Sequence, residues 1–153
     1  LKIIEKLRDA RPDIVFSSDI IIGFPGETGK AFENTLDLVK KVNYSQAYSF
    51  KYSRRPGTPG SIMKGQVAES IKSERLLRLQ EILYSQQLYF NRAFIGKNMG
   101  ILIERRKKNN QLVGRSPYMQ AVHLLEDNCE IGDILNIKVF DADKNSLKGE
   151  VVQ

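Results

Sequence analysis

Two glycines and an acid stand at the end of an apolar run in SSDIIIGFPGET, residues 17–28. Gly23 and Gly26 lack side chains, so the backbone there can approach a ligand closely, and the free amides of a following helix favour an electron-rich group. Glu27, an acceptor when ionised, could take hydrogen bonds from a ribose hydroxyl or from nearby amides. The spacing indicates either a ligand-binding loop or a tight turn with a solvated Glu27. It is not a P-loop, because no Gly-Lys-Ser/Thr follows.

A second polar cluster follows the next apolar segment, in YSFKYSRRPGTPG, residues 48–60. It comprises Tyr52, Ser53, Arg54 and Arg55. Ligands of α/β folds lie outside the carboxyl ends of the strands, so both clusters are expected on the same rim. A second polar strand end favours a binding site, although Arg54 and Arg55 taken alone are more often a solvated pair than a phosphate clamp.

Residues 1–54 are expected to form a helix, a strand, a second helix and a second strand. The first strand, in IVFSSDIIIGF, is continuously apolar after Asp19, as in parallel sheets buried on both faces, whereas the second, in SQAYSFKYS, alternates. Thr28 can cap the second helix. This order is typical of an α/β fold with right-handed crossovers. The apolar faces of the two helices are Ile3, Ile4, Leu7 and Ala10, and then Phe32, Leu36 and Val39.

A long helical pattern runs from about Val67 to Ile95 without Gly or Pro, and Gly96 is well placed to end it. Beyond Gly96, five short β-like runs alternate with turn sequences, which predicts a small barrel or sandwich. We therefore place a domain boundary at 95/96, between domains 1–95 and 96–153. The apolar face of the long helix consists of Leu76, Leu79, Leu83, Phe90 and Phe94.

The composition is that of a globular protein, with 41% hydrophobic and 27% charged residues, and no apolar run is long enough to span a membrane. The single cysteine, Cys129, excludes an internal disulfide and a metal cage made of cysteines alone. It fits a reducing, cytoplasmic compartment and is expected to pack as a small apolar residue. The chain begins at Leu1 without a signal peptide, and we expect it to be a piece of a longer protein.

The net charge of +6 is compatible with a polyanionic partner. The segment ERRKKNNQ gathers four cations in a predicted hairpin loop, where they could follow a phosphate backbone. Tyr118 and His123 are candidate stacking groups, although His123 in AVHLL is expected to be partly buried and not catalytic. The alternative is a solvated turn, since residues 96–153 hold nine Lys and Arg against eight Asp and Glu. The candidate RNA contacts are Arg105, Arg106, Lys107, Lys108, Arg115 and Tyr118.

Five segments stand in a fixed order along the chain: SSDIIIGFPGET, YSFKYSRRPGTPG, SERLLRLQEIL, GRSPYMQAVHLL and SLKGEVV. Taken together, they resemble the radical S-adenosylmethionine methylthiotransferases over nearly the whole chain. The resemblance implies the end of a partial TIM-like radical SAM barrel over residues 1 to about 62, then a helix over 67–95 that leads out of it. It implies a TRAM domain, an OB-like RNA-binding β-barrel, over 96–153. GRSPYMQAVHLL favours the branch that adds a methylthio group to carbon 2 of a prenylated adenosine beside the tRNA anticodon. Branches acting on threonylcarbamoyl-adenosine or on a ribosomal protein are less similar there.

The resemblance also implies positions and partners. The S-adenosylmethionine pocket would involve Asp19, Gly23, Gly26, Glu27, Tyr52 and Ser53. The family carries two 4Fe–4S clusters, one on a CxxxCxxC motif and one on three N-terminal cysteines, and this chain has neither set. No catalytic or metal-binding residue is therefore assigned, and the chain alone is expected to be inactive. The expected partner is tRNA, with no membrane and a monomeric state; the alternative is a non-catalytic RNA-binding adaptor.

Overall fold

A computed structural model describes residues 1–108, 110–124 and 129–152. The chain divides into two compact units, residues 1–86 and 87–153, which are described separately. Helix α4, Glu69–Arg92, begins in the first unit and ends in the second. This division between residues 86 and 87 falls within α4, whereas the sequence pattern changes only after Gly96. The boundary at 95/96 between functional domains therefore stays a proposal.

The first unit is a two-stranded parallel sheet with helices, in the expected order. Strand β1 pairs with β2 from Ser17 opposite Gln46 to Ile22 opposite Lys51. Local chemistry sets the start of α2, because Thr28 Oγ1 accepts a hydrogen bond from the Ala31 amide at 3.1 Å. Its elements are α1 (Lys2–Ala10), β1 (Ser17–Ile22), α2 (Gly29–Val42), β2 (Gln46–Lys51), the short α3 (Pro59–Ile62) and the first part of α4.

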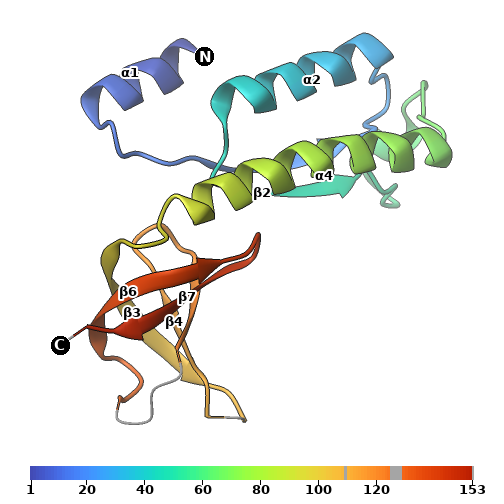
Figure 1. Ribbon diagram of the computed structural model, residues 1–153. Helices are drawn as coiled ribbons and strands as arrows, with labels where there is room; N and C mark the ends of the chain where they lie inside the picture. Colours follow the sequence, from blue (N-terminus) through green and yellow to red (C-terminus); the bar gives the residue numbers. More distant parts are fainter. Residues whose placement is uncertain (109, 125–128, 153) are drawn as a thin grey trace. The chain divides into compact units, whose positions relative to one another are not determined.

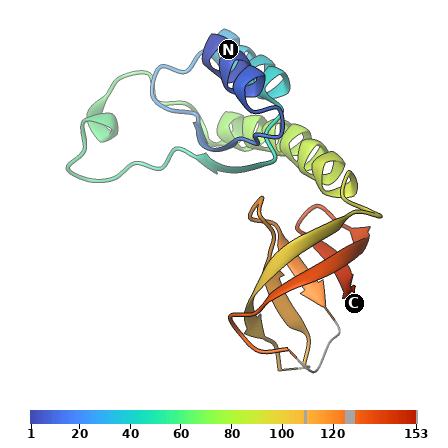
Figure 2. The same cartoon turned by 90° about the vertical axis from the view of Figure 1, so that its left-hand side faces the viewer.

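Helices α2 and α4 cover one face of this sheet (Figure 1). Ile22 of β1 meets the apolar stripes of both helices, as expected from their three-and-four spacing. The segment between β2 and α4 leaves the sheet as a long loop that carries α3 (Figure 2). The buried core consists of Ile22, Phe32, Leu36, Val39, Leu79 and Leu83.

The expectation that β1 is buried on both faces is wrong for this chain. Burial alternates along the strand, and Ile21 is 59% exposed although Ile22 beside it is 1% exposed. Tyr48 and Phe50 of β2 are 57% and 53% exposed, and they lie opposite Asp19 and Ile21. No second layer of the described chain covers this face, which we call the open face.

The second unit is a closed five-stranded barrel with the neighbour order β3-β4-β5-β7-β6, which decides between the barrel and the sandwich (Figure 2). Only the β5–β7 pair is parallel among the barrel pairs of the described residues. Alternate residues point inward, so apolar side chains from every strand fill the interior. The strands are β3 (Asn98–Arg106), β4 (Leu112–Arg115), β5 (Ala121–Leu124), β6 (Ile134–Ala142) and β7 (Ser146–Val151).

The end of α4 packs on this barrel through a buried polar network. Asn91, 2% exposed, donates to the Asp143 carbonyl oxygen at 2.8 Å and accepts from Gln120 Nε2 at 2.8 Å. Each polar group therefore has a partner away from water, as buried amides require. The helix ends at Arg92, and Gly96 follows in the left-handed region with φ +84°, so the expected stop lies just beyond the last helical turn.

Candidate functional site

A cavity of about 580 Å³ opens where β1 and β2 end at their carboxyl sides. Its wall is mostly apolar and aromatic and includes some polar groups, which suits a flat heterocycle carrying hydroxyl groups. Tyr52 and Ser53 contribute to it, as expected from the sequence. The lining residues are Ile21, Phe24, Phe50, Lys51, Tyr52, Ser53, Arg55, Thr58 and Gly60.

Tyr52 contributes an aromatic ring to this wall. Its ring contacts that of Phe24 edge-to-face, with centroids 5.0 Å apart. A Cβ on Gly60 would lie 2.6 Å from the Tyr52 hydroxyl oxygen, so only glycine lets the ring lie here. That hydroxyl is buried and has no hydrogen-bond partner among the residues that the structure describes.

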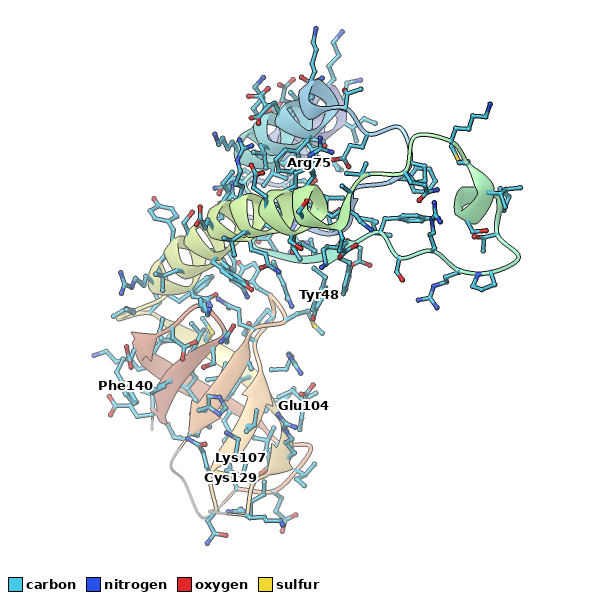
Figure 3. All side chains as sticks on the ribbon, turned by 90° about the vertical axis from the view of Figure 1, so that its right-hand side faces the viewer. Tyr48, Arg75, Glu104, Lys107, Cys129 and Phe140 are labelled. Atoms are coloured by element: carbon cyan, nitrogen blue, oxygen red, sulfur yellow. The ribbon has the colours of Figure 1, made fainter. Side chains whose placement is uncertain are left out.

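The tight-turn alternative required a solvated Glu27, but the Glu27 side chain is only 14% exposed. Its Oε2 accepts from the Gly23 amide at 2.6 Å, and its Oε1 pairs with Arg75 Nη1 at 2.7 Å. Arg75 also donates to the Glu27 carbonyl oxygen at 3.1 Å, reaching it from α4 (Figure 3). The carboxylate therefore braces its own loop and ties that loop to a helix 48 residues away.

The two glycines of the loop differ in their surroundings. Both have left-handed backbone, with φ +72° at Gly23 and +87° at Gly26. A Cβ on Gly23 would lie 2.2 Å from Lys72 Cγ, whereas one on Gly26 would meet nothing within 4 Å. The side of Gly23 that lacks a side chain is thus filled by Lys72, and the Gly26 amide donates to the Gly65 carbonyl oxygen at 2.8 Å.

The remaining expected position, Asp19, lies exposed on the open face and is not part of the cavity wall. Figure 3 labels Tyr48, its neighbour across the sheet. Sequence reasoning missed Lys72 and Arg75, the two cations of α4 that hold the loops. Their i, i+3 spacing puts them on one face of the helix, but nothing in the sequence shows which loop that face meets.

The basic segment of the barrel is only partly a loop. Arg105 and Arg106 lie in β3, paired with Val113 and Leu112, which corrects the expectation that all four cations are loop residues. The reason is that the paired part of the hairpin extends further than expected, because β3 and β4 stay paired up to Arg106 opposite Leu112. Arg106 Nη2 donates to the Cys129 carbonyl oxygen at 2.8 Å.

Lys107 follows β3 directly, and its Nζ donates to Gln111 Oε1 at 3.0 Å. Figure 3 labels Lys107 and Cys129 at the same end of the barrel. Cys129 itself packs against the barrel core from a partly buried position, close to its expected role as a small apolar residue. The cations of this hairpin thus gather at one end of the barrel.

The other candidate RNA contacts have partners within the protein. Arg115 pairs with Glu104 at 3.1 Å and donates to the Met119 carbonyl oxygen. The Tyr118 ring is partly buried against Phe90 of α4 and Phe94 just beyond that helix, with centroids 5.9 and 5.3 Å away, so part of its surface already contacts the protein.

His123 is partly buried, as expected. Burial, followed by the charge of Lys107, lowers the pKa of its imidazole below the usual value. The ring is therefore neutral at pH 7, and it offers no positive charge to a phosphate there.

No group of three or more His, Cys, Asp or Glu that could hold a metal ion occurs among residues 1–108, 110–124 and 129–152. Within the same described ranges, no helix is both long and apolar enough to cross a bilayer.

Residues 92–152 match the TRAM domain model. The chain is 53% identical over 152 residues to a tRNA-2-methylthio-N(6)-dimethylallyladenosine synthase of Rickettsia rickettsii (strain Sheila Smith), covering 98% of this chain and 34% of the relative. Enzymes of the same description from Wolbachia pipientis subsp. Culex pipiens (strain wPip) and Ehrlichia canis (strain Jake) are 53% and 54% identical, over 97% and 99% of this chain. The chain spans about a third of the length of these relatives.

Proposed function

We infer that this chain belongs to the tRNA methylthiotransferases as the C-terminal third of a tRNA-2-methylthio-N(6)-dimethylallyladenosine synthase. The observation that carries this inference is the identity of 53% over 152 residues, which runs through both compact units. The intact protein would add a methylthio group to carbon 2 of a prenylated adenosine beside the tRNA anticodon. The branches acting on threonylcarbamoyl-adenosine or on a ribosomal protein are the alternatives.

The cavity at the strand ends is proposed as part of the S-adenosylmethionine site. Its aromatic wall suits the adenine, and the exposed Ser53 would supply a hydrogen bond for a polar group. When bound, S-adenosylmethionine would supply the radical and the methyl group of the reaction. Within this chain, Tyr52 and Phe24 would orient the ligand, and Glu27 would keep the adjoining loop in place.

The iron–sulfur clusters do not fit this chain. Each cluster needs several thiolates, and Cys129 is the one cysteine of the sequence. Their ligands are therefore proposed to lie in the two thirds of the intact protein that this chain does not cover. The chain alone would bind and position but would not carry out the transfer.

The barrel is proposed to bind tRNA through the cations at the β3–β4 end. Arg105, Lys107 and Lys108 are exposed there, close together along the hairpin. Phosphate contacts of this kind give affinity without sequence specificity, which suits a domain that delivers a substrate to a site elsewhere.

The proposed function predicts a specific product. The intact protein, with both clusters reconstituted, is incubated with S-adenosylmethionine and prenylated tRNA, and the digested nucleosides are analysed by mass spectrometry. We expect a methylthio group on the prenylated adenosine. A product only on threonylcarbamoyl-adenosine or on a ribosomal protein would move the protein to another branch, and tRNA binding without any product would support the adaptor.

The proposed RNA contact predicts a change in salt dependence. Replacing Arg105, Lys107 and Lys108 with Ala should weaken tRNA binding and flatten the slope of log affinity against log salt by up to about 2 to 3 units. The measurement is fluorescence anisotropy with labelled tRNA between low and physiological salt. Arg106 is left in place because it holds the Cys129 carbonyl group.

The matched control removes three cations from the other unit, at Lys2, Lys6 and Lys40, and so makes the same change in net charge. It should leave the slope nearly unchanged. Equal slopes for the two variants would mean that the hairpin is only a solvated turn.

A further inference from the structure

The first turns of α4 contact both loops that border the cavity, without being part of its wall. Lys72 and Arg75 stand three residues apart, on one face of the helix, and neither is among the lining residues. Their side chains are 12% and 11% exposed, which is unusual for cations on a helix of this kind. Such burial needs a partner for each charge, and each has more than one.

Lys72 joins the ends of the two strands. Its methylene groups fill the side of Gly23 where a Cβ would lie, just after β1. Its ammonium donates to the Tyr52 carbonyl oxygen at 3.0 Å, just after β2, and pairs with Glu69 at 2.7 Å. Hydrogen bonds from Lys51 and then from Lys72 lower the pKa of Glu69 to about 2, so this carboxylate is ionised at neutral pH.

Arg75 holds the far side of the first loop. It donates to the carboxylate and to the carbonyl oxygen of Glu27, whose other oxygen accepts from the Gly23 amide. The guanidinium also lies 5.4 Å from the centre of the Phe32 ring. Two cations of one helix face thus contact three points of the rim: Gly23, Glu27 and Tyr52.

We propose that Lys72 and Arg75 are positioning residues for the cavity, which hold the loops after β1 and β2 at the spacing that a bound ligand requires. The loops carry Phe24, Tyr52 and Ser53 into the wall, and these three residues lie outside every helix and strand. The inference rests on the proposed function, since the ligand it names is S-adenosylmethionine. The inference goes beyond the proposed function because it states that side chains of α4 hold the cavity in its ligand-binding shape before the ligand binds.

The first test needs no ligand. Amide hydrogen exchange is measured on the chain itself for Lys72→Met, which keeps the methylene groups over Gly23, and for Arg75→Lys, which keeps the charge but not the fork. The Gly23 amide donates to Glu27 Oε2 and the Tyr52 amide to the Ile22 carbonyl oxygen, and exchange at these two amides should become about tenfold faster, because opening of the loops becomes easier. Exchange in the barrel should stay unchanged. Unchanged exchange at both the Gly23 and the Tyr52 amides would overturn the proposal.

Matched controls exist on α2 and α4. Lys41→Met removes the ammonium of an exposed pair with Asp37, and Arg78→Lys alters an exposed pair with Glu33. Both should behave as the unsubstituted protein does. If they accelerate exchange at Gly23 as much as the test variants do, the effect is a general loss of charge pairing and the proposal fails.

The second test uses the intact, reconstituted protein. Lys72→Met and Arg75→Lys should weaken S-adenosylmethionine binding by about tenfold in calorimetry and raise its KM, with kcat at saturation nearly kept. A purely structural loss of folded protein would lower kcat instead. Normal ligand affinity in both variants would overturn the positioning role while leaving the site itself in place. An intact protein that binds no S-adenosylmethionine at all would instead overturn the proposed function, and this inference with it.

Discussion

Glu27→Ala is expected to destabilise the unit of residues 1–86 by about 3 kcal/mol. The substitution leaves the Arg75 guanidinium, 11% exposed, without its carboxylate, and it frees the Gly23 amide. Urea unfolding followed by NMR of the Ile22 methyl groups measures this unit, and those of Ile137 report on the barrel, which should not change. In the intact protein, S-adenosylmethionine binding should weaken at least tenfold, since about 1.5 to 3 kcal/mol accompanies each charge-assisted hydrogen bond lost.

The chain offers a close control for this experiment in Glu33→Ala. Glu33 pairs with Arg78 at 2.7 Å, the same distance as Glu27 with Arg75, and again between the α2 region and α4. The side chains of Glu33 and Arg78 are 56% and 43% exposed, so this pair should contribute less than about 1 kcal/mol. Equal losses for the two variants would show that burial of the Glu27 pair has no energetic consequence.

Gly23→Ala is expected to destabilise the same unit by about 3 to 5 kcal/mol, well beyond Gly26→Ala at about 1 to 2 kcal/mol. Both positions have left-handed backbone, so both variants incur the conformational strain. At Gly23 the added Cβ also meets Lys72 Cγ at 2.2 Å, whereas at Gly26 it meets nothing within 4 Å. The difference between the two variants in urea unfolding therefore isolates the contact with Lys72.

A second substitution separates strain from crowding. Lys72→Ala combined with Gly23→Ala should recover part of the lost stability, because it removes the methylene groups that the new Cβ meets. Gly23→Val should be worse than Gly23→Ala, since a β-branched side chain tolerates this backbone poorly. Equal stability of Gly23→Ala and Gly26→Ala would mean that the loop moves away from α4 at no cost.

The order of the elements follows from local sequence patterns and is confirmed. Periodicity of three and four placed Phe32, Leu36 and Val39 on the buried side of α2, and the Thr28 hydroxyl caps that helix. The five barrel strands follow from short β-like runs between turn sequences. These features depend on neighbours within a few residues, which is why a single sequence predicts them.

The exposure of the open face was not predictable in the same way. The run of three isoleucines in β1 is equally compatible with a strand covered on both sides. Whether Ile21 is covered depends on what packs on the sheet, and in the part of the chain that the structure describes α2 and α4 pack on the other face. Likewise, four consecutive cations do not reveal that β3 continues through Arg106, because pairing with β4 sets the end of the strand.

By itself, the sequence determined that GFPGET is a turn between a strand and a helix, because Gly23 and Gly26 supply the left-handed backbone that this turn requires. It also determined that the cluster cysteines are absent, since composition alone decides that. Only the tertiary structure decided what fills the space beside Gly23 and what neutralises Glu27. Lys72 and Arg75 reach the loop from a helix that follows it by more than 40 residues, and the docking of α4 is set by burial of Leu79 and Leu83, not by any local signal in the loop.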